Sequence, residues 1–337
     1  IQNWTLLRYG EEIQRDQILG ATGVLPGLLS AIRAFCPPQS KVLLHAPAYT
    51  QLYVTIRAAG CIPVESPLKK ESDGYRIDFE DLERQLNSDT KAFLLCNPHN
   101  PTGNCWGRED LETLVSLCAR NGTVVLSDEI HCDFIAQGHN FTPIFSLESE
   151  FAERNAISFN SATKSFNLSA FKTGYLYARN KKLLEKIVAS GHSQVVNTLG
   201  VVASRAAYEE SADWLDAVVS YIEQNMRYLE NYLAKNAPLI KFQRPEGTYL
   251  AWLDFSGWME KIGATQLAAS ESKDKDASKI HAGDIMERIL VEQAGVQLDR
   301  GYRFGAGGEN FLRMNVGTSR VLLKRALDNI STAIRAS

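Results

Sequence analysis

The sequence lacks several features that mark well-known classes of protein. It has no run of about 18 uncharged apolar residues, which a membrane-spanning helix requires. Its basic residues are dispersed and its formal net charge is −3, so neither a nucleic acid nor a membrane surface is indicated as a partner. Its six cysteines form no C-x-x-C pair. We therefore predict reduced thiols in a cytoplasmic protein rather than a disulfide framework.

What is present is the composition of an ordinary globular protein, with 45% hydrophobic and 22% charged residues. In the first half, short and almost continuously apolar runs alternate with helical patterns. This alternation favours an α/β fold in which helices cover both faces of a mainly parallel sheet. The predicted strands are 41–47, 91–98, 123–129, 156–162 and 173–179.

The second half has a different pattern. A long helix is predicted over 213–235, and shorter strands and helices follow it, which indicates a smaller α+β domain. We divide the chain into a large domain, 1–225, and a small C-terminal domain, 226–337. The polar segment 268–279 is predicted to be an exposed, mobile loop without a binding site.

Four short motifs stand at predicted strand ends or at a helix start, where open α/β sheets bind ligands. In the first, Thr22 and Gly23 precede a helical run that has Pro26 in its first turn. A helix start offers free N–H groups and a positive dipole end, which favour a phosphate. The G-K-[ST] of a nucleotide-binding loop is absent. A purely structural helix start is the alternative.

The second motif is NPHNPTG, residues 97–103, which follows a predicted strand. Its two Asn-Pro pairs indicate a rigid turn that directs the side chain of Asn100. A plain connecting turn without a ligand explains the same pattern. The residues alone leave both interpretations open.

The third motif, SDEIH, ends another predicted strand. A buried carboxylate there, Asp128, needs a cationic partner. With His131 it resembles half of a metal site, but the nearby Cys132, Asp133 and His139 match no zinc-site spacing. We therefore predict no metal. A capping or salt-bridging role for Asp128 stays open.

The fourth motif places Lys164 among small and hydroxyl residues, with Ser161 and Thr163 just before it. Lys172 follows eight positions later and adds a second positive charge. Such a lysine is a nucleophile, a phosphate ligand, a buried ion-pair partner or, most commonly for a short motif of this kind, an exposed side chain. The other motifs decide among these.

One ligand, pyridoxal 5′-phosphate, uses all four motifs. Its phosphate suits the helix start, Ser161 and Lys172, and its aldehyde suits the amine of Lys164. Its ring nitrogen suits Asp128, and its phenolate oxygen suits a hydrogen bond from Asn100. No single motif has this specificity on its own.

The motifs, in this order and over essentially the whole chain, resemble the fold-type I pyridoxal-phosphate enzymes of the aminotransferase class I/II superfamily. The resemblance implies a mainly parallel seven-stranded sheet between helices and a smaller C-terminal domain. It implies that Lys164 bonds covalently to the cofactor and that Tyr49, in the phrase PAY, stacks on its ring. It also implies that Arg313, together with Asn100, grips the substrate carboxylate. A surface charge is the alternative for Arg313. The cofactor-binding residues expected in full are Thr22, Gly23, Val24, Tyr49, Asn100, Asp128, His131, Ser161, Thr163, Lys164 and Lys172.

A finer resemblance is to the MalY/PatB type of cystathionine β-lyase. His131 stands where typical aminotransferases have tyrosine, and the phrases GHNFTPIFSL, TKSFNLSAFKTGY and PEGTYLAWLDF are similar to that branch. This implies cleavage of a C–S bond in an amino acid to a thiol, pyruvate and ammonia, with Lys164 as the base. The residues themselves do not separate this reaction from transamination. A non-catalytic regulatory domain that binds the cofactor is disfavoured because Lys164, Asp128 and Arg313 are all retained.

The family resemblance also bears on assembly and on the N-terminus. It implies a homodimer, and the apolar stretch VVNTLGVVAS is the candidate contact. The opening residues, IQNWTLLRYGEE, have the pattern of a helix interior without an initiator Met or a signal peptide. Family members have an N-terminal arm before this point, so the chain is expected to be truncated at its N-terminus; whether the native protein has the arm stays open here.

Overall fold

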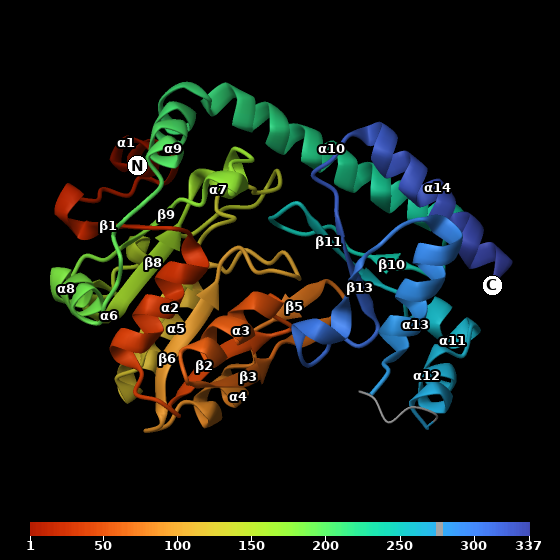
Figure 1. Ribbon diagram of the computed structural model, residues 1–337, viewed down its shortest axis with the longest axis horizontal. Coiled ribbons are helices and arrows are strands. Elements are labelled where there is room, and N and C mark those ends of the chain that lie inside the picture. The colour runs from red at the N-terminus through yellow and green to blue at the C-terminus, as the bar shows by residue number, and fades with distance from the viewer. Residues whose placement is uncertain (274–278) are drawn as a thin grey trace.

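The computed structural model describes residues 1–273 and 279–337 and shows two domains joined by one long helix (Figure 1). The helices are α1 (Gln2–Tyr9), α2 (Val24–Phe35), α3 (Thr50–Ala58), α4 (Phe79–Gln85), α5 (Arg108–Asn121), α6 (Glu150–Asn155), α7 (Ala162–Ser165), α8 (Lys181–Ala189), α9 (Thr198–Glu210), α10 (Ala212–Asn236), α11 (Ser256–Lys261), α12 (Ala264–Lys273), α13 (Ala282–Ile289) and α14 (Arg320–Ala336). The strands are β1 (Ile18–Ala21), β2 (Lys41–Ala46), β3 (Ile62–Pro67), β4 (Lys69–Glu71), β5 (Gly74–Arg76), β6 (Thr90–Cys96), β7 (Val124–Asp128), β8 (Ala156–Asn160), β9 (Gly174–Tyr177), β10 (Lys241–Phe242), β11 (Leu250–Asp254), β12 (Asp299–Arg300) and β13 (Phe311–Asn315).

The large domain is built on a seven-stranded sheet in the order β1-β9-β8-β7-β6-β2-β3. Neighbouring strands from β8 to β3 are parallel, and β9 is antiparallel to both β1 and β8. This confirms the predicted mainly parallel sheet, and the five predicted apolar runs form β2, β6, β7, β8 and β9. The edge strands β1 and β3 were not predicted, because most of their residues are only half-buried or exposed and lack a continuous apolar run.

Alternate side chains of the central strands fill two separate cores, one on each face of the sheet. Leu94 and Leu126 pack into the core beneath α2 and α3. Phe93 and Val125, one position earlier on the same strands, pack into the core beneath α5. Burial on both faces explains why these strands read as continuous apolar runs.

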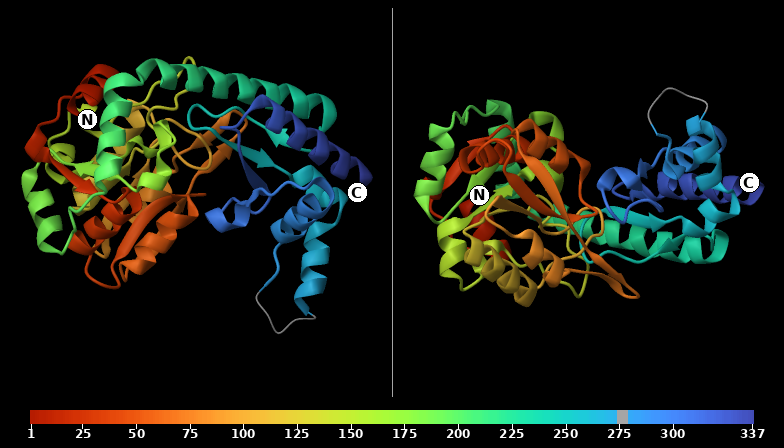
Figure 2. Two further views of the ribbon diagram at one scale, coloured as in Figure 1. Left: turned by 45° about the horizontal axis from the view of Figure 1, so that its top comes forward. Right: turned by 90° about the horizontal axis from the view of Figure 1, so that it is seen from below.

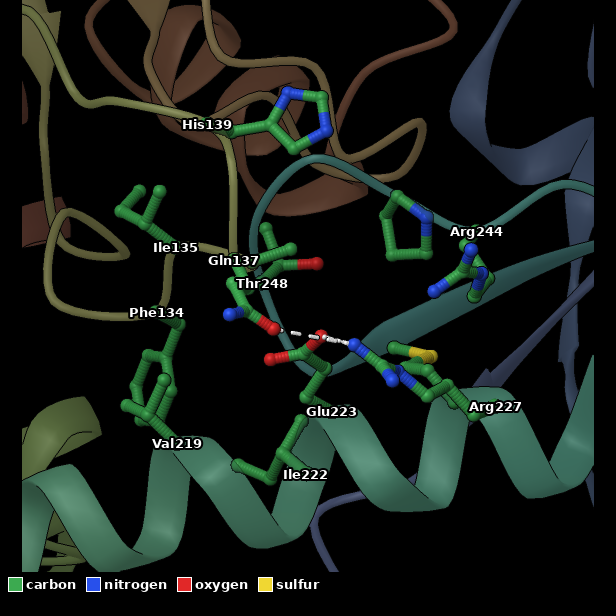
Figure 3. Close-up of a pocket in the computed structure, with 13 residues that line it drawn as sticks. Phe134, Ile135, Gln137, His139, Val219, Ile222, Glu223, Arg227, Arg244 and Thr248 are labelled. Carbon is green, nitrogen blue, oxygen red and sulfur yellow. Dashed lines mark hydrogen bonds and ion pairs between the residues drawn. The ribbon is translucent and has the colours of Figure 1, made fainter.

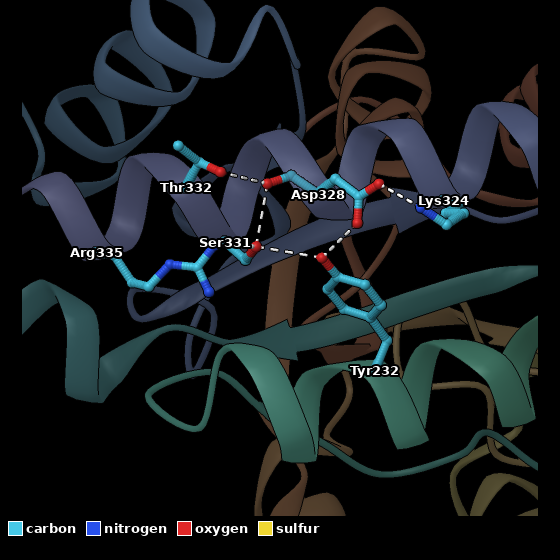
Figure 4. Close-up of polar contacts among 6 residues, drawn as sticks. All are labelled: Tyr232, Lys324, Asp328, Ser331, Thr332 and Arg335. Atoms are coloured by element: carbon cyan, nitrogen blue, oxygen red, sulfur yellow. Dashed lines mark hydrogen bonds and ion pairs between the residues drawn. The ribbon is translucent and has the colours of Figure 1, made fainter.

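The small domain is a four-stranded antiparallel sheet, β10-β11-β13-β12, packed against helices. The views agree that α10 runs from the large domain along one side of the small domain, beside α14 (Figures 1 and 2). The hydroxyl of Tyr232 on α10 donates to Asp328 on α14 at 2.7 Å and lies 3.2 Å from the Ser331 hydroxyl (Figure 4). The long helix predicted over 213–235 is confirmed, and we propose that the domain boundary falls within it, after residue 225.

A second set of contacts ties α10 to the large domain beside a surface cavity of about 280 Å³ (Figure 3). Arg227 of α10 donates to Glu223 on the same helix at 2.6 Å and to Gln137, in the loop after β7, at 3.3 Å. An isolated β-bridge joins Ile135 of that loop to Gly247, just before β11. The loop after β7 therefore contacts both α10 and the entry to the small-domain sheet.

The predicted loop over 268–279 is wrong in its first half, because α12 continues through Lys273. The sequence ATQLAASESK is rich in good helix formers. Ala264 and Ala268, one helical turn apart, are buried in the small-domain core and hold the helix in place. Lys279 is exposed and lies outside any helix or strand, as predicted, and residues 274–278 lie outside the described residues.

Within residues 1–273 and 279–337, no helix combines the length and the apolar character needed to cross a bilayer. Several helices pack against other helices, as α12 does on α13 and α10 on α14. The largest of them, α10, has buried residues on one side only, among them Leu229 and Leu233.

Candidate active site

A cleft of about 390 Å³ lies where the large-domain strands end and α2 begins, and it reaches the small-domain strand β13. This is the edge of the sheet where open α/β folds bind ligands. All the predicted cofactor and substrate residues except Ser161 line the cleft. Its walls include Thr22, Gly23, Val24, Tyr49, Asn100, Asp128, His131, Thr163, Lys164, Lys172 and Arg313.

One end of the cleft is the N-terminus of α2. The helix begins at Val24 with Gly23 as its N-cap. No side chain of the described residues caps it, so its first N–H groups lack a partner within the helix. Strand β9 passes so close that a Cβ on Gly174 would lie 2.9 Å from the backbone of Gly23. Lys172 lines the same cleft. Free N–H groups, a helix dipole and a lysine together favour a bound anion.

The structure does not bring Ser161 into this cleft. Its side chain is buried, and its hydroxyl donates to the carbonyl of Thr173 at 2.6 Å. The same oxygen accepts the N–H of Thr163 at 3.0 Å and so caps α7. Ser161 thus stabilises the turn that carries Lys164.

Asp128 is the last residue of β7 and is 5% exposed. Burial raises the pKa of its carboxyl from 3.8 to about 6, although the N–H of Ile130 and the charge of Lys164 oppose this. The Ile130 N–H donates to one carboxylate oxygen at 3.2 Å. A buried carboxylate of this kind favours a proton-carrying partner in the cleft.

Lys164 is the third residue of the short helix α7, which Ser161 caps. Burial lowers the pKa of its amine, and the nearby charge of Arg313 lowers it further, while Asp128 acts in the opposite direction. An amine with a lowered pKa is uncharged more of the time at neutral pH. The uncharged amine is the form that attacks a carbonyl carbon and accepts protons.

His131 lies three residues after Asp128 and is buried. Burial lowers its pKa to about 3, and the charges of Lys164 and Arg313 act in the same direction, so the imidazole is neutral. Its Nδ1 atom has no hydrogen-bond partner in residues 1–273 and 279–337. The ring packs edge-on against Tyr249 with 5.5 Å between the centroids.

The other end of the cleft is formed by Arg313 on β13 of the small domain. Its guanidinium donates to Oδ1 of Asn100, from the large domain, at 2.8 Å. The rings of Phe304 and Tyr49 lie 4.9 and 5.8 Å from the guanidinium carbon. Arg313 also donates to Asp299 on the neighbouring strand. This end carries a cationic fork of the kind that binds carboxylates.

Several cleft residues were not singled out by the sequence analysis. Tyr249, Asn315, Ser169 and Thr173 line the same cavity. Asn315 follows Arg313 by two positions on the same strand. Because side chains alternate between the two faces of a strand, this spacing indicates that both residues lie on the same face. Tyr249 stood inside a recognised phrase, but nothing in the local pattern indicated that its ring faces the cleft.

Among the described residues, no three His, Cys, Asp or Glu side chains gather into a group able to hold a metal ion. His139, which the sequence placed near Asp128 and His131, is exposed and lines the other cavity (Figure 3). The cleft presents groups that bind an organic molecule, namely amines, a carboxylate, a guanidinium and backbone N–H groups.

Comparison with known proteins agrees with this site. The family described as Aminotransferase class I and II matches residues 4–330. Cystathionine beta-lyase PatB of Bacillus subtilis is 33% identical over 98% of this chain and 81% of its own length. Protein MalY of Escherichia coli is 29% identical over 100% of this chain and 81% of its own. A structure of the PLP-bound C-S lyase from Staphylococcus hominis has a TM-score of 0.86 and 30% identity, and covers 99% of this chain and 82% of that one. The resemblance seen in the sequence is confirmed: the chain belongs to the aminotransferase class I and II family.

Proposed function

We propose that this protein is a pyridoxal-phosphate-dependent C–S β-lyase that acts on cystathionine-like or cysteine S-conjugate amino acids. The observation that carries the proposal is that relatives aligned over nearly the whole chain are named cystathionine beta-lyase or C-S lyase. In this chain, Lys164, Asp128 and Arg313 line one cleft. The same relatives favour lyase activity over the aminotransferase alternative.

The residues of the cleft fit the cofactor. The uncapped start of α2 offers N–H donors for a phosphate, and Lys164 offers an amine for an aldehyde. The buried carboxyl of Asp128 suits a protonated ring nitrogen. When bound, pyridoxal 5′-phosphate supplies an aldehyde carbon for an amine and a ring that withdraws electrons from the substrate Cα.

The chain's own residues then have separate tasks. Asp128 holds a proton at the ring nitrogen, because a buried carboxylate is stabilised by an adjacent positive charge. Arg313 and Asn100 orient the α-carboxylate of the substrate. Lys164, with its lowered pKa, takes the proton from Cα. The Cβ–S bond breaks with its electron pair on sulfur, a proton gives the thiol, and water completes conversion of the remainder to pyruvate and ammonia.

Product analysis on the protein loaded with pyridoxal 5′-phosphate tests this function. An S-substituted L-cysteine should give thiol, pyruvate and ammonia in equal amounts without any keto acid being added. The matched control substrate carries an alkyl group on Cβ in place of sulfur and should release neither pyruvate nor ammonia. Fast keto-acid-dependent amino transfer, without pyruvate from S-substituted cysteines, would overturn the proposal in favour of an aminotransferase.

We also propose that the protein is a homodimer. The stretch 195–204 exposes apolar side chains, since Val195, Leu199 and Val202 are 77%, 67% and 61% exposed. Trp4 of α1 packs against Tyr208 of α9, with 5.2 Å between ring centroids, so α1 borders this surface. Sedimentation should show a dimer that Leu199→Asp converts to a monomer. A wild-type monomer that turns over substrate would contradict the proposal.

A cytoplasmic location is proposed on the state of the cysteines. All six are free thiols, and five are buried. Proteins of oxidising compartments commonly use such residues in disulfides, whereas cytoplasmic proteins keep them reduced. To test this, cells are lysed directly into a denaturant that contains an alkylating agent, and the alkylated cysteines of the protein are counted. All six cysteines should be alkylated. A smaller number would argue against this location.

A further inference from the structure

The guanidinium of Arg313 already holds a carboxylate in this structure. Asp299 on β12 is paired directly with Arg313 on β13, so the two side chains are cross-strand neighbours. Nε of Arg313 lies 3.2 Å from Oδ2 of Asp299, and a terminal guanidinium nitrogen donates to the same oxygen. The Nε–H and this terminal N–H form one edge of the guanidinium. A carboxylate that binds arginine through two parallel hydrogen bonds uses an edge of this kind.

Part of the rest of the guanidinium is also engaged. The other terminal nitrogen donates to Oδ1 of Asn100 at 2.8 Å, and the rings of Phe304 and Tyr49 lie near the guanidinium carbon. An arriving carboxylate therefore meets a fork of which one edge is bonded to Asp299. To make two bonds there, it has to take N–H groups that Asp299 now uses.

The pair is unequal in its exposure, which makes this exchange feasible. The side chain of Arg313 is 13% exposed, whereas that of Asp299 is 58% exposed. A carboxylate so open to water is held weakly and can be replaced at little cost. Asp299 and Arg313 also line a smaller cavity of about 270 Å³, together with Arg300, Arg303 and Glu287 among others, and Glu287 pairs with Arg300 at 3.2 Å. A displaced Asp299 carboxylate has room there beside Arg303.

We propose that Asp299 is a positioning residue that occupies Arg313 between turnovers and competes with the substrate α-carboxylate for it. This inference rests on the proposed role of Arg313 in binding that carboxylate. The strand pairing sets Asp299 directly beside Arg313. The competition therefore acts on the affinity for carboxylates, and so on KM, rather than on kcat.

Asp299→Asn tests the inference, because it removes the charge with little change of shape. The probes are 3-(methylthio)propanoate, which has no amine and cannot react, and its uncharged amide. Calorimetry on the protein loaded with pyridoxal 5′-phosphate should show the carboxylate binding about two- to fivefold more tightly to the variant. Affinity for the amide should not change. KM for an S-substituted cysteine should fall by a similar factor with kcat nearly constant, and Asp299→Ala should act in the same direction.

Asp216→Asn is the matched control. Asp216 is also 58% exposed and pairs with Arg8 at 2.7 Å, away from the cleft. The loss of its charge should therefore change the affinity of neither probe. Unchanged or weaker carboxylate binding in both Asp299 variants would overturn the competition.

Arg313→Ala separates this failure from failure of the proposed function. It should abolish the preference for the carboxylate probe over the amide. If that preference persists, the role assigned to Arg313 is wrong. If it is lost and the Asp299 variants still bind the carboxylate no better, only the competition is wrong.

Discussion

The two ends of the cleft are built in different ways. The end of the cleft at the start of α2 consists of large-domain backbone and of side chains on buried strand ends, and Asp128 there is only 5% exposed. The opposite end depends on Arg313, which reaches Asn100 from the small domain across 213 residues of sequence, and on Asp299, which is 58% exposed. One end is fixed by a single sheet, and the other by a contact between two domains.

This difference predicts a division of labour. Groups held by one rigid element keep their geometry whether or not a substrate is present, which suits permanent binding of a cofactor. Groups on two domains can tighten or loosen together, which suits a substrate that enters and leaves. Substitutions at the two ends should therefore separate cofactor binding from substrate use.

The largest effect is expected from Lys164→Ala. The variant loses the amine that takes the Cα proton, so pyruvate release should fall by at least about 10³-fold. Lys182→Ala, at an exposed position on α8, is the control and should retain wild-type activity. A Lys164→Ala enzyme with only a few-fold loss would remove Lys164 from the mechanism.

Next in size is Arg313→Ala at the other end. Losing a bidentate, charge-assisted contact costs about 2–4 kcal/mol, or roughly 30- to 1,000-fold in kcat/KM. Affinity for pyridoxal 5′-phosphate, measured by fluorescence titration, should stay the same. Arg313→Lys should recover little, because lysine lacks the planar fork. An equal loss of cofactor affinity would erase the distinction between the two ends.

Asp128→Asn should separate stability from function. Because the folded-state pKa of Asp128 is raised from 3.8 to about 6, its contribution to stability is present below the lower value and is lost as the pH rises through the upper one. Asparagine does not titrate and keeps an oxygen for the Ile130 N–H. In the absence of cofactor, the free energy of unfolding of the variant, relative to that of the wild type, should therefore rise by on the order of 1 kcal/mol between pH 5.0 and pH 7.5.

Urea unfolding of both cofactor-free proteins at the two pH values measures this difference in the free energy of unfolding. An activity assay should show that the variant is impaired at both pH values. A variant that is less stable at pH 7.5 than at pH 5.0, relative to the wild type, would contradict the burial argument for Asp128.

The smallest effect is expected from Ser161→Ala. Loss of its cap on α7 should cost about 1 kcal/mol in the free energy of unfolding. Affinity for the cofactor should fall less than in Lys172→Ala, because Lys172 lines the cleft and Ser161 does not. If both variants lose cofactor affinity equally, the hydroxyl of Ser161 contributes to the phosphate end after all.

The sequence was most informative about the large-domain end. Asn100 follows the parallel strand β6 and Asp128 ends the parallel strand β7. The carboxyl ends of such strands meet at one edge of a sheet, so the convergence of the two side chains is a consequence of local pattern. The direction of a side chain within a tight turn is not set by spacing, which is why Ser161 was expected in the cleft and lies behind it.

The small-domain end was beyond such reasoning. The contact between Arg313 and Asn100 joins distant segments, and the sequence indicated it only through the family resemblance. The pairing of Asp299 with Arg313 depends on the register of a two-residue strand, which has no recognisable pattern. The start of 268–279 has the polar composition of a loop, but its helix propensity and the buried Ala264 and Ala268 make it part of α12.

The most direct test of the site is to find the lysine that bonds to the cofactor. Borohydride reduction of the protein loaded with pyridoxal 5′-phosphate, followed by peptide mapping, fixes the cofactor to its amine. We predict one labelled peptide, which contains Lys164, and no label in Lys164→Ala. A label on Lys172, or on any other lysine of the wild-type protein, would contradict the account.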